Sequence, residues 1–564
     1  MIAPSSMQFL AVTVMGLMAS VRTLAAQGGP PRPPAEVSVA QAALQAGLAD
    51  SAIRTLEGFF ARNPNATAGR LLLGNAFVQK GDTDKAIAAY QQITAPRPMR
   101  LQATFLTAAL HARRGRSDEA LKLLEQLKAS GAYDMDLART AADFAPIRSD
   151  PRFASVMFAP ADFANPFVEP VRVIHEWRGE AKGDQFSWIA RGIGDVDGDK
   201  VSDVVTSAPT FGANGQPTGP GKVYVYSGRS GKLLWERVGQ VGEGLGTGLE
   251  GAGDVNRDGV PDVIAGAPGS GHAYVYSGRD GKTLLTLTGT AQESYGNSAA
   301  GAGDQNGDGY ADVIVGAPSS NANGEGAGRA YVVSGKDGAV IATLGGQQAG
   351  DAFGSIVAGN KRGRGTPVLV GAPGGGPNDR GSVSVFTRLT SPPTRVIAAD
   401  STGAALGGMF TSLVGDVNGD KVADVYASDF SNSAKGAATG RVYVYSGADG
   451  RRLYTLTGEN AGDGFGIGSA DVGDVNRDGF DDLLVGAWQY SAAAQSGGKI
   501  YLYSGRDGSL LRQITGRVPG ETLGFDATGV GDVDGDGVID LLVTSSWSNI
   551  NGFRSGRMFV ISGK

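Results

Sequence analysis

The 564-residue sequence contains no cysteine, only three histidines and no block of basic residues. Without cysteine the chain has no disulfide and no thiol for lipid attachment, so an exported form must be stabilised in another way. Lysine and arginine number 50 against 56 aspartates and glutamates, which gives a formal net charge of −6. This balance gives no electrostatic support to a nucleic-acid partner. Glycine is abundant at 89 residues, and this composition favours many short strands joined by tight turns.

Long apolar runs are also lacking, except for one near the N-terminus. Phe9 to Ala19 is apolar and is followed by the small residues of Thr23 to Ala26. We therefore expect residues 1–26 to be a signal peptide, cleaved near Ala25 or Ala26, with a short membrane anchor as the alternative. No later run is long enough to span a bilayer. The expected location is secreted, periplasmic or cell-surface, with no stable transmembrane segment after cleavage.

A nine-residue acidic motif occurs six times, with Asp or Asn at positions 1, 3 and 5 and Asp at position 9. Such a cluster would repel itself unless a hard cation lay inside it, and oxygen ligands at this spacing suit Ca²⁺. We expect about six structural Ca²⁺ ions, each bound by these four side chains and by the backbone carbonyl of position 7. The expected ligands are Asp195, Asp197, Asp199, Val201 and Asp203; Asp254, Asn256, Asp258, Val260 and Asp262; Asp304, Asn306, Asp308, Tyr310 and Asp312; Asp416, Asn418, Asp420, Val422 and Asp424; Asp474, Asn476, Asp478, Phe480 and Asp482; and Asp532, Asp534, Asp536, Val538 and Asp540.

Position 6 and the alternatives to a calcium loop refine this prediction. Position 6 is glycine in four copies, which fits a left-handed backbone, but it is Lys200 and Lys421 in the other two, so we expect those two sites to be strained or weaker. An EF-hand is excluded because its position 12 needs Glu, where Thr206 and Ala265 stand, and because the flanking sequence is β-rich. A solvated Asp turn without metal is the other alternative. A damaged seventh copy, residues 360–368, has cations in place of ligands, and no Ca²⁺ is expected there.

The motif also counts structural repeats, because its copies begin about 50 to 59 residues apart when the damaged copy is included. Each unit has a glycine-rich segment such as Tyr295-Gly, Phe353-Gly or Phe465-Gly, then the acidic motif, then an apolar run. That run ends in Gly-Ala-Pro or a variant, as at Gly266 and Gly316, and two further strands follow. Four strands per unit are typical of a propeller blade. The ordered set of motifs resembles the FG-GAP repeats of the integrin α-subunit propeller, over residues 171–564.

The final unit predicts how the ring closes. It ends after its third strand, at Met558 to Ser562, whereas Val171 to Trp177 resembles a fourth strand and stands before the first unit. We therefore expect Val171 to Trp177 to complete blade seven, because an unpaired ring would leave exposed edges. The resulting fold class is multidomain, with an all-β seven-bladed propeller after an all-α region.

That all-α region is expected at residues 36–157, after a Gly/Pro-rich spacer at 27–35 and before a linker at 158–170. Three segments share a turn glycine, then alanine five residues later and a bulky residue four after that. They are Gly47/Ala52/Leu56, Gly81/Ala86/Tyr90 and Gly115/Ala120/Leu124, in steps of 34 residues. The pattern resembles the tetratricopeptide repeat (TPR). The resemblance implies a groove for a peptide or protein partner; a short helical spacer is the alternative.

Sequence motifs for catalysis are few. His111, His175 and His272 are scattered, and no nucleophile elbow, zinc cluster or phosphate loop occurs. We expect a calcium-binding interaction or adhesion protein, not an enzyme. The alternative is a secreted hydrolase or lyase acting on polysaccharide or lipid.

The integrin resemblance implies that a protein or glycan partner binds on the face opposite the calcium loops. The corresponding loops are Phe211 to Gly219, Asn321 to Gly328, Trp488 to Gly498 and Trp547 to Ser555. Their aromatic residues Trp488, Tyr490, Trp547 and Phe553 would offer flat apolar surfaces, unless they pack loop against strand.

Overall fold

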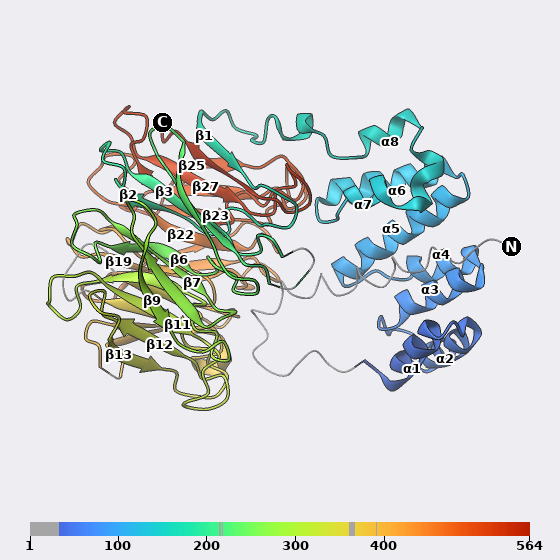
Figure 1. Ribbon diagram of the computed structural model, residues 1–564, viewed down its shortest axis with the longest axis horizontal. Helices are drawn as coiled ribbons and strands as arrows, with labels where there is room; N and C mark the ends of the chain where they lie inside the picture. Colours follow the sequence, from blue (N-terminus) through green and yellow to red (C-terminus); the bar gives the residue numbers. More distant parts are fainter. Residues whose placement is uncertain (1–32, 214–215, 217, 360–366, 391) are drawn as a thin grey trace. The chain divides into compact units, whose positions relative to one another are not determined.

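The computed structural model describes residues 33–213, 216, 218–359, 367–390 and 392–564. These residues divide into a helical unit that ends at Ala164 and a β-unit that begins at Asn165 (Figure 1). Residues 1–26, where a signal peptide is expected, lie outside the described residues. Among the described residues, no helix combines the length and apolar character that crossing a membrane requires.

The helical unit consists of three helical hairpins followed by short helical segments. Its elements are α1 (Ala35–Gln45), α2 (Ala49–Arg62), α3 (Arg70–Lys80), α4 (Thr83–Gln91), α5 (Arg97–Arg113), α6 (Ser117–Ser130), α7 (Asp136–Thr140), η2 (Ala142–Ile147), α8 (Pro151–Ser155) and η3 (Pro160–Phe163). The three predicted repeats correspond to the hairpins α1/α2, α3/α4 and α5/α6.

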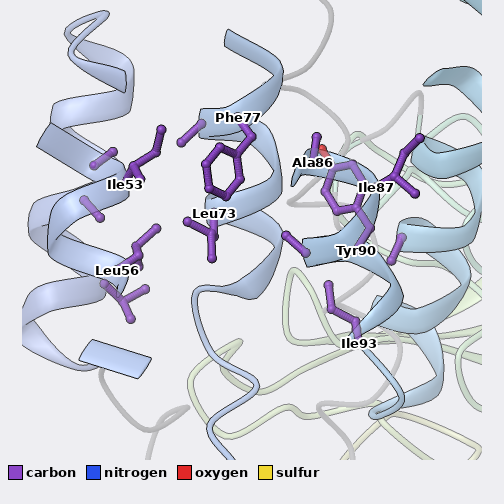
Figure 2. Packing of buried hydrophobic residues seen from close by; sticks show 14 of the residues in the cluster. Ile53, Leu56, Leu73, Phe77, Ala86, Ile87, Tyr90 and Ile93 are labelled. Atoms are coloured by element: carbon purple, nitrogen blue, oxygen red, sulfur yellow. The ribbon is translucent and has the colours of Figure 1, made fainter. Parts of the chain in front are cut away.

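The second hairpin shows why the repeated small and bulky residues are needed. Gly81 adopts a left-handed φ of 83° between α3 and α4, and Asp82 caps α4 by accepting from the Lys85 N–H. A Cβ atom on Gly74 would lie 2.2 Å from the Tyr90 ring, so the close packing of α3 on α4 requires glycine there. Figure 2 shows Tyr90 with Leu73 and Phe77 in the apolar layer between the helices.

The segment after α6 covers the open side of the last hairpin. Phe144 and Ile147 of η2 and Phe153 of α8 belong to one buried cluster with Leu124 and Leu127 of α6. A helical repeat stack needs such a cap, because its last hairpin otherwise exposes an apolar face.

From Asn165 onward the described residues form seven four-stranded antiparallel sheets. The blades, with strands in spatial order, are as follows: β2 (Ala190–Gly194), β3 (Asp203–Ala208), β4 (Lys222–Tyr226) and β5 (Leu233–Val238); β6 (Leu249–Gly253), β7 (Asp262–Ala267), β8 (His272–Tyr276) and β9 (Thr283–Thr288); β10 (Ala299–Gly303), β11 (Asp312–Ala317), β12 (Arg329–Val333) and β13 (Val340–Gly345); β14 (Ile356–Gly359), β15 (Val368–Ala372), β16 (Ser382–Phe386, preceded by η4, Pro377–Asp379) and β17 (Arg395–Ala398); β18 (Thr411–Val414), β19 (Asp424–Asp429), β20 (Arg441–Tyr445) and β21 (Arg452–Thr457); β22 (Phe465–Gly473), β23 (Asp482–Ala487), β24 (Lys499–Tyr503) and β25 (Leu510–Thr515); and β26 (Ala527–Gly531), β27 (Asp540–Ser545), β28 (Arg557–Ile561) and β1 (Val173–Arg178).

The first strands of neighbouring blades contact one another in cyclic order, and β26 of the seventh blade contacts β2 of the first. The second strand of every blade is buried along its whole length, for example β7 and β11. Both faces of these strands are covered by neighbouring blades, which explains their nearly continuous runs of small and β-branched residues. The fold is therefore the predicted seven-bladed propeller.

The glycines of the two repeated motifs meet between blades. A Cβ atom on Gly266, which begins Gly-Ala-Pro in blade 2, would lie 1.8 Å from the carbonyl oxygen of Gly296 in blade 3. Gly296 follows Tyr295, has a left-handed φ of 91°, and donates its N–H to Gly316 within its own blade. The repeated pair of motifs thus exists because two backbones approach too closely for side chains.

Ring closure follows the sequence prediction. β1 pairs antiparallel with β28, with Trp177 opposite Met558 and Glu176 opposite Phe559. The fourth strand of blade seven therefore comes from the N-terminal side of the array.

The expected linker at 158–170 needs correction, because its second half is part of the propeller. Phe167 forms a bridge with Gly516, and the Val168 N–H donates to Thr515 at the edge of β25. Glu169 accepts from the backbone N–H of Thr515 at 2.6 Å and from its hydroxyl at 2.9 Å. We call residues 166–178 the closing segment, since it follows the outer edge of blade six and then completes blade seven.

Candidate metal loops and the opposite loop face

The acidic motifs connect the first strand to the second in six blades, as in Asp195 to Asp203 between β2 and β3. In antiparallel blades this connection and the turn between the third and fourth strands lie at the same end. We call this the motif end of the propeller. The other connections lie at the opposite end. Residues 360–366 of the damaged copy lie outside the described residues, so its expected lack of Ca²⁺ stays a prediction.

The first copy shows how the loop is folded around its carboxylates. Asp195 accepts from the backbone N–H groups of Gly198 at 2.7 Å and Lys200 at 2.8 Å. Asp197 accepts from Asp199, and Asp199 accepts from Val201. The other five copies repeat this pattern, so the side chains at positions 1, 3 and 5 are held on the inside of a tight turn.

The aspartate at position 9 is the most buried member of each loop. Asp262 has no exposed surface and accepts from the N–H of Val255 at 2.9 Å and of Gly278 at 3.0 Å. It therefore links its own loop to the turn after the third strand, and the equivalent aspartates of the other five copies do the same. Burial raises the pKa of Asp203, Asp262 and Asp424 to about 6, with help from neighbouring carboxylates and against the backbone hydrogen bonds.

These loops have the chemistry of a hard-cation site. One carboxylate oxygen from each of Asp195, Asp197 and Asp203 lies within 4.8 Å of the other two, and Asp532, Asp534 and Asp536 form a second such group. The other four copies have Asn at position 3, which supplies an amide oxygen instead. Buried, mutually repelling carboxylates would be relieved by a bound cation, so the residues present fit a divalent ion.

Position 6 is left-handed in every copy, as predicted. The four glycines have φ between 82° and 89°, whereas Lys200 and Lys421 have φ of 71° and 68°. A lysine in this region is strained relative to glycine.

Three of the loops already contact protein cations, and in the second copy Arg279 lies 4.0 Å from Asp258. The Arg229 guanidinium lies 3.1 Å from Asp199, and Lys564 lies 3.4 Å from Asp536. Arg172 of the closing segment also contacts Asp534 and Asp536 of the last loop. These side chains partly neutralise the loops they contact.

The opposite end carries a second series of acids that sequence reasoning missed. Six blades have Asp or Glu two residues before the aromatic or leucine that precedes the motif glycine, which is replaced by Ser187 in blade 1; these acids are Asp184, Glu243, Glu293, Asp351, Asp463 and Glu521. Glu243 accepts from the Gln240 N–H, and Asp463 accepts from the Asn460 N–H. Glu521 instead pairs with Arg557, which is equally buried. The regular spacing to the aromatic position was the signal that would have found them.

The aromatic residues expected on the opposite face differ in role. Tyr490 follows the alternative of packing against a strand: it is 9% exposed, its hydroxyl donates to Glu459, and Lys499 lies over its ring. Trp488 and Trp547 are only partly buried and contact each other edge to face, with ring centroids 4.9 Å apart. Phe553 is also partly buried, under Arg554.

The three histidines lie in different places. His111 is on α5, and its Nδ1 is buried without a hydrogen-bond partner. His175 is on β1, with Nε2 2.8 Å from the Gly228 carbonyl. His272 is the first residue of β8 and bonds to Ser270.

Comparison with known proteins supports both halves of this description. Models of the tetratricopeptide repeat match residues 40–100 and 71–134. An FG-GAP-like repeat model matches residues 254–315, and the FG-GAP repeat model matches residues 192–226 and 467–503.

Curated relatives are integrin α-chains. Integrin alpha-3 of Cricetulus griseus is 33% identical over 159 residues, which cover 25% of this chain and 15% of the relative. Integrin alpha-4 of Xenopus laevis is 30% identical over 208 residues, covering 34% of this chain and 19% of the relative. Integrin alpha-2 of Bos taurus is 31% identical over 182 residues, covering 29% and 14%. The chain thus spans less than a fifth of the length of these relatives. Together with the fold, these matches identify the chain as an FG-GAP-repeat, integrin α-like β-propeller protein with N-terminal tetratricopeptide-like repeats.

Proposed function

We propose that this chain is an exported adhesion-type protein whose propeller is stabilised by six Ca²⁺ ions. The observation that supports it best is the repeated buried aspartate at position 9, which holds each acidic loop around one centre with backbone hydrogen bonds. The donor set contains only oxygen, and that set favours Ca²⁺ over softer ions. The position-7 carbonyls would complete each site.

Calcium would replace the disulfides that this sequence lacks. Extracellular modules bind Ca²⁺ with dissociation constants of roughly 10⁻⁴–10⁻³ M. A tenfold excess of free ion over such a constant stabilises the native state by about 1.4 kcal/mol per site. Six sites would then contribute about 8 kcal/mol, which is comparable to the stability of a whole domain.

The test is metal content and thermal stability of the purified chain. We expect about six Ca²⁺ ions per chain by elemental analysis, and a fall in melting temperature after chelation with EDTA that Ca²⁺ reverses. Mg²⁺ should restore less, because it demands a tighter octahedral site. A melting temperature unchanged by chelation would refute the calcium part of the proposal.

The adhesion part places partner binding at the opposite end, through the variable connections between second and third strands. The resemblance to integrin α-chains and the concentration of irregular loops at that end support it. The helical unit would offer a second contact for a peptide. Substitutions in the loop at Trp488 to Gly498 should weaken partner capture and leave the Ca²⁺ content unchanged. Catalytic turnover in an activity screen would contradict the non-enzymatic part.

A further inference from the structure

Three of the five tryptophans of the chain lie in one cluster at the opposite end of the propeller. Trp188, Trp488 and Trp547 surround Phe525, with ring centroids 4.8, 5.6 and 6.4 Å from it. Phe525 is 1% exposed, whereas the three tryptophans are only partly buried. The planes of Trp488 and Trp547 cross at 81°, so their rings form a corner above an apolar floor. We call Trp488 and Trp547 the indole corner.

Comparison among the blades shows that the fold does not require these aromatics. The third position of the Gly-Ala-Pro motif is proline in blades 1 to 4, at Pro209, Pro268, Pro318 and Pro373. The same position is Phe430 in blade 5 and Trp488 in blade 6, and in blade 7 it is Ser546, which Trp547 follows directly. Since the backbone is repeated and proline suffices in four blades, the large side chains on one half of this end need another explanation.

The indole N–H groups point to the same conclusion. Trp177 and Trp235, which pack between blades, donate their N–H groups to the Gly231 and Gly278 carbonyls at 2.8 and 2.7 Å. The Nε1 atoms of Trp488 and Trp547 are buried and have no hydrogen-bond partner. An unsatisfied buried donor costs free energy, so this corner is not optimised for stability.

The surroundings of the corner are polar but almost uncharged. The loop from Trp488 to Gly498 contains no charged residue, and that from Trp547 to Gly556 contains only Arg554. The Arg554 guanidinium lies 4.1 Å from the centre of the Trp547 ring. Ser491 and Gln495 are exposed at the rim and offer hydroxyl and amide groups. A nucleic acid or a charged peptide would find little complementary charge here, whereas a neutral polyhydroxylated ring matches both the apolar rings and the polar rim.

We propose that the indole corner binds a pyranose ring of a neutral glycan. The apolar face of the sugar stacks on an indole ring, and its hydroxyl groups bond to the rim amides and hydroxyls. This proposal rests on the proposed use of the opposite end for partner binding, and it names the chemistry of that partner.

The test uses the full chain in Ca²⁺ and a panel of neutral oligosaccharides of glucose, galactose, mannose, xylose and N-acetylglucosamine. Binding is measured by calorimetry and by intrinsic tryptophan fluorescence, to which Trp488 and Trp547 contribute directly. We expect at least one oligosaccharide to bind, and Trp488→Ala or Trp547→Ala to lower its affinity by about tenfold or more, as truncation of an aromatic anchor does. Trp488→Phe keeps an aromatic ring and should retain part of the affinity. It therefore distinguishes loss of stacking from loss of folding. Pro318→Ala, at the matching position of blade 3, is the control and should leave the affinity unchanged.

Two outcomes would overturn the glycan proposal. One is the absence of saccharide binding at millimolar concentration; the other is saccharide binding that survives both tryptophan-to-alanine changes. Capture of a defined protein that Trp488→Ala abolishes, with no saccharide bound, would also overturn it while supporting partner binding at this end. Calcium-dependent stability is measured separately, so the calcium proposal can hold even if the glycan proposal is refuted.

Discussion

Phe167 contacts Phe559 edge to face, with ring centroids 5.1 Å apart and ring planes at 66°. The first residue enters the propeller from the helical unit and the second lies on β28, the last strand of the array. Both belong to one buried cluster with Leu502 and Ile514 of blade six, so this contact seals the junction between the last two blades.

Phe167→Ala should therefore destabilise the propeller by about 3–5 kcal/mol, since the substitution removes a buried aromatic ring and leaves a cavity. Chemical denaturation followed by tryptophan fluorescence measures the change. Val241→Ala is a suitable control, because Val241 is 91% exposed. Equal stability of the two variants would show that the Phe167 ring does not stabilise the junction between blades six and seven.

Deletion of residues 171–178 should be more severe, because it removes β1 and exposes the edge of β28. We expect a lower melting temperature for the whole propeller and a tendency to aggregate. Light scattering and calorimetry detect both effects. An unchanged melting temperature would mean that six and three-quarter blades suffice.

The loop aspartates should separate into two classes. Asp262→Ala orphans the buried N–H groups of Val255 and Gly278, at a cost of about 1–3 kcal/mol each, and should lower the melting temperature even in EDTA. Asp258 is exposed, so Asp258→Ala should lower the melting temperature mainly when Ca²⁺ is present. Thermal unfolding of both variants with and without Ca²⁺ tests this. A loss confined to Ca²⁺ for Asp262→Ala would contradict the structural role of position 9.

The Arg557–Glu521 pair is buried, with both side chains 1% exposed and Nε 2.5 Å from Oε1. Arg557→Met should destabilise the chain by about 3–5 kcal/mol, because it leaves the Glu521 charge without its partner. Adding Glu521→Leu should recover part of this loss. Denaturant unfolding of the single and double variants measures the coupling, and additive losses would contradict it.

His111 makes the helical unit sensitive to acid. Burial lowers the pKa of its imidazole below the ordinary 6.5. The unfolded chain then binds a proton at a higher pH than the folded chain does. The free energy of unfolding is therefore unaffected by His111 above about pH 6.5 and decreases as the pH drops below that value. Circular dichroism at 222 nm, read at neutral and mildly acidic pH, follows the helices. His111→Gln should show a smaller loss at acidic pH than the native chain.

Much of the fold could be predicted from repetition, because each motif copy marks one blade and the missing fourth strand identifies β1. The close approach of Gly266 and Gly296 could not be predicted, because the sequence does not show which residue of the next blade each glycine contacts. The anchoring of Phe167 was missed because the Pro- and Asn-containing sequence around it is typical of a linker. Whether Tyr490 packs in its blade or faces outward could not be decided from the sequence, because Glu459, which accepts from its hydroxyl, is 31 residues away.

The candidate site divides in the same way. The acidic motif indicates its own ligands, since spacing within nine residues fixes the turn. The indole corner arises from Trp488 and Trp547 on separate blades, and only the ring brings them together. A site built from neighbouring residues, such as an acidic loop, could therefore be predicted from the sequence. A site whose residues come from different blades, such as the indole corner, could not.

The pairing of β1 with β28 also means that blade seven can be completed only after nearly the whole propeller has been synthesised. Val173 and Ile561, which lie directly opposite each other in this pairing, are separated by 388 residues, and at about 5–20 residues per second the ribosome needs roughly 20–80 s to make the chain between them. During that time β1 has no partner strand, so its edge is open to pairing with a strand of a neighbouring molecule until β28 has been made.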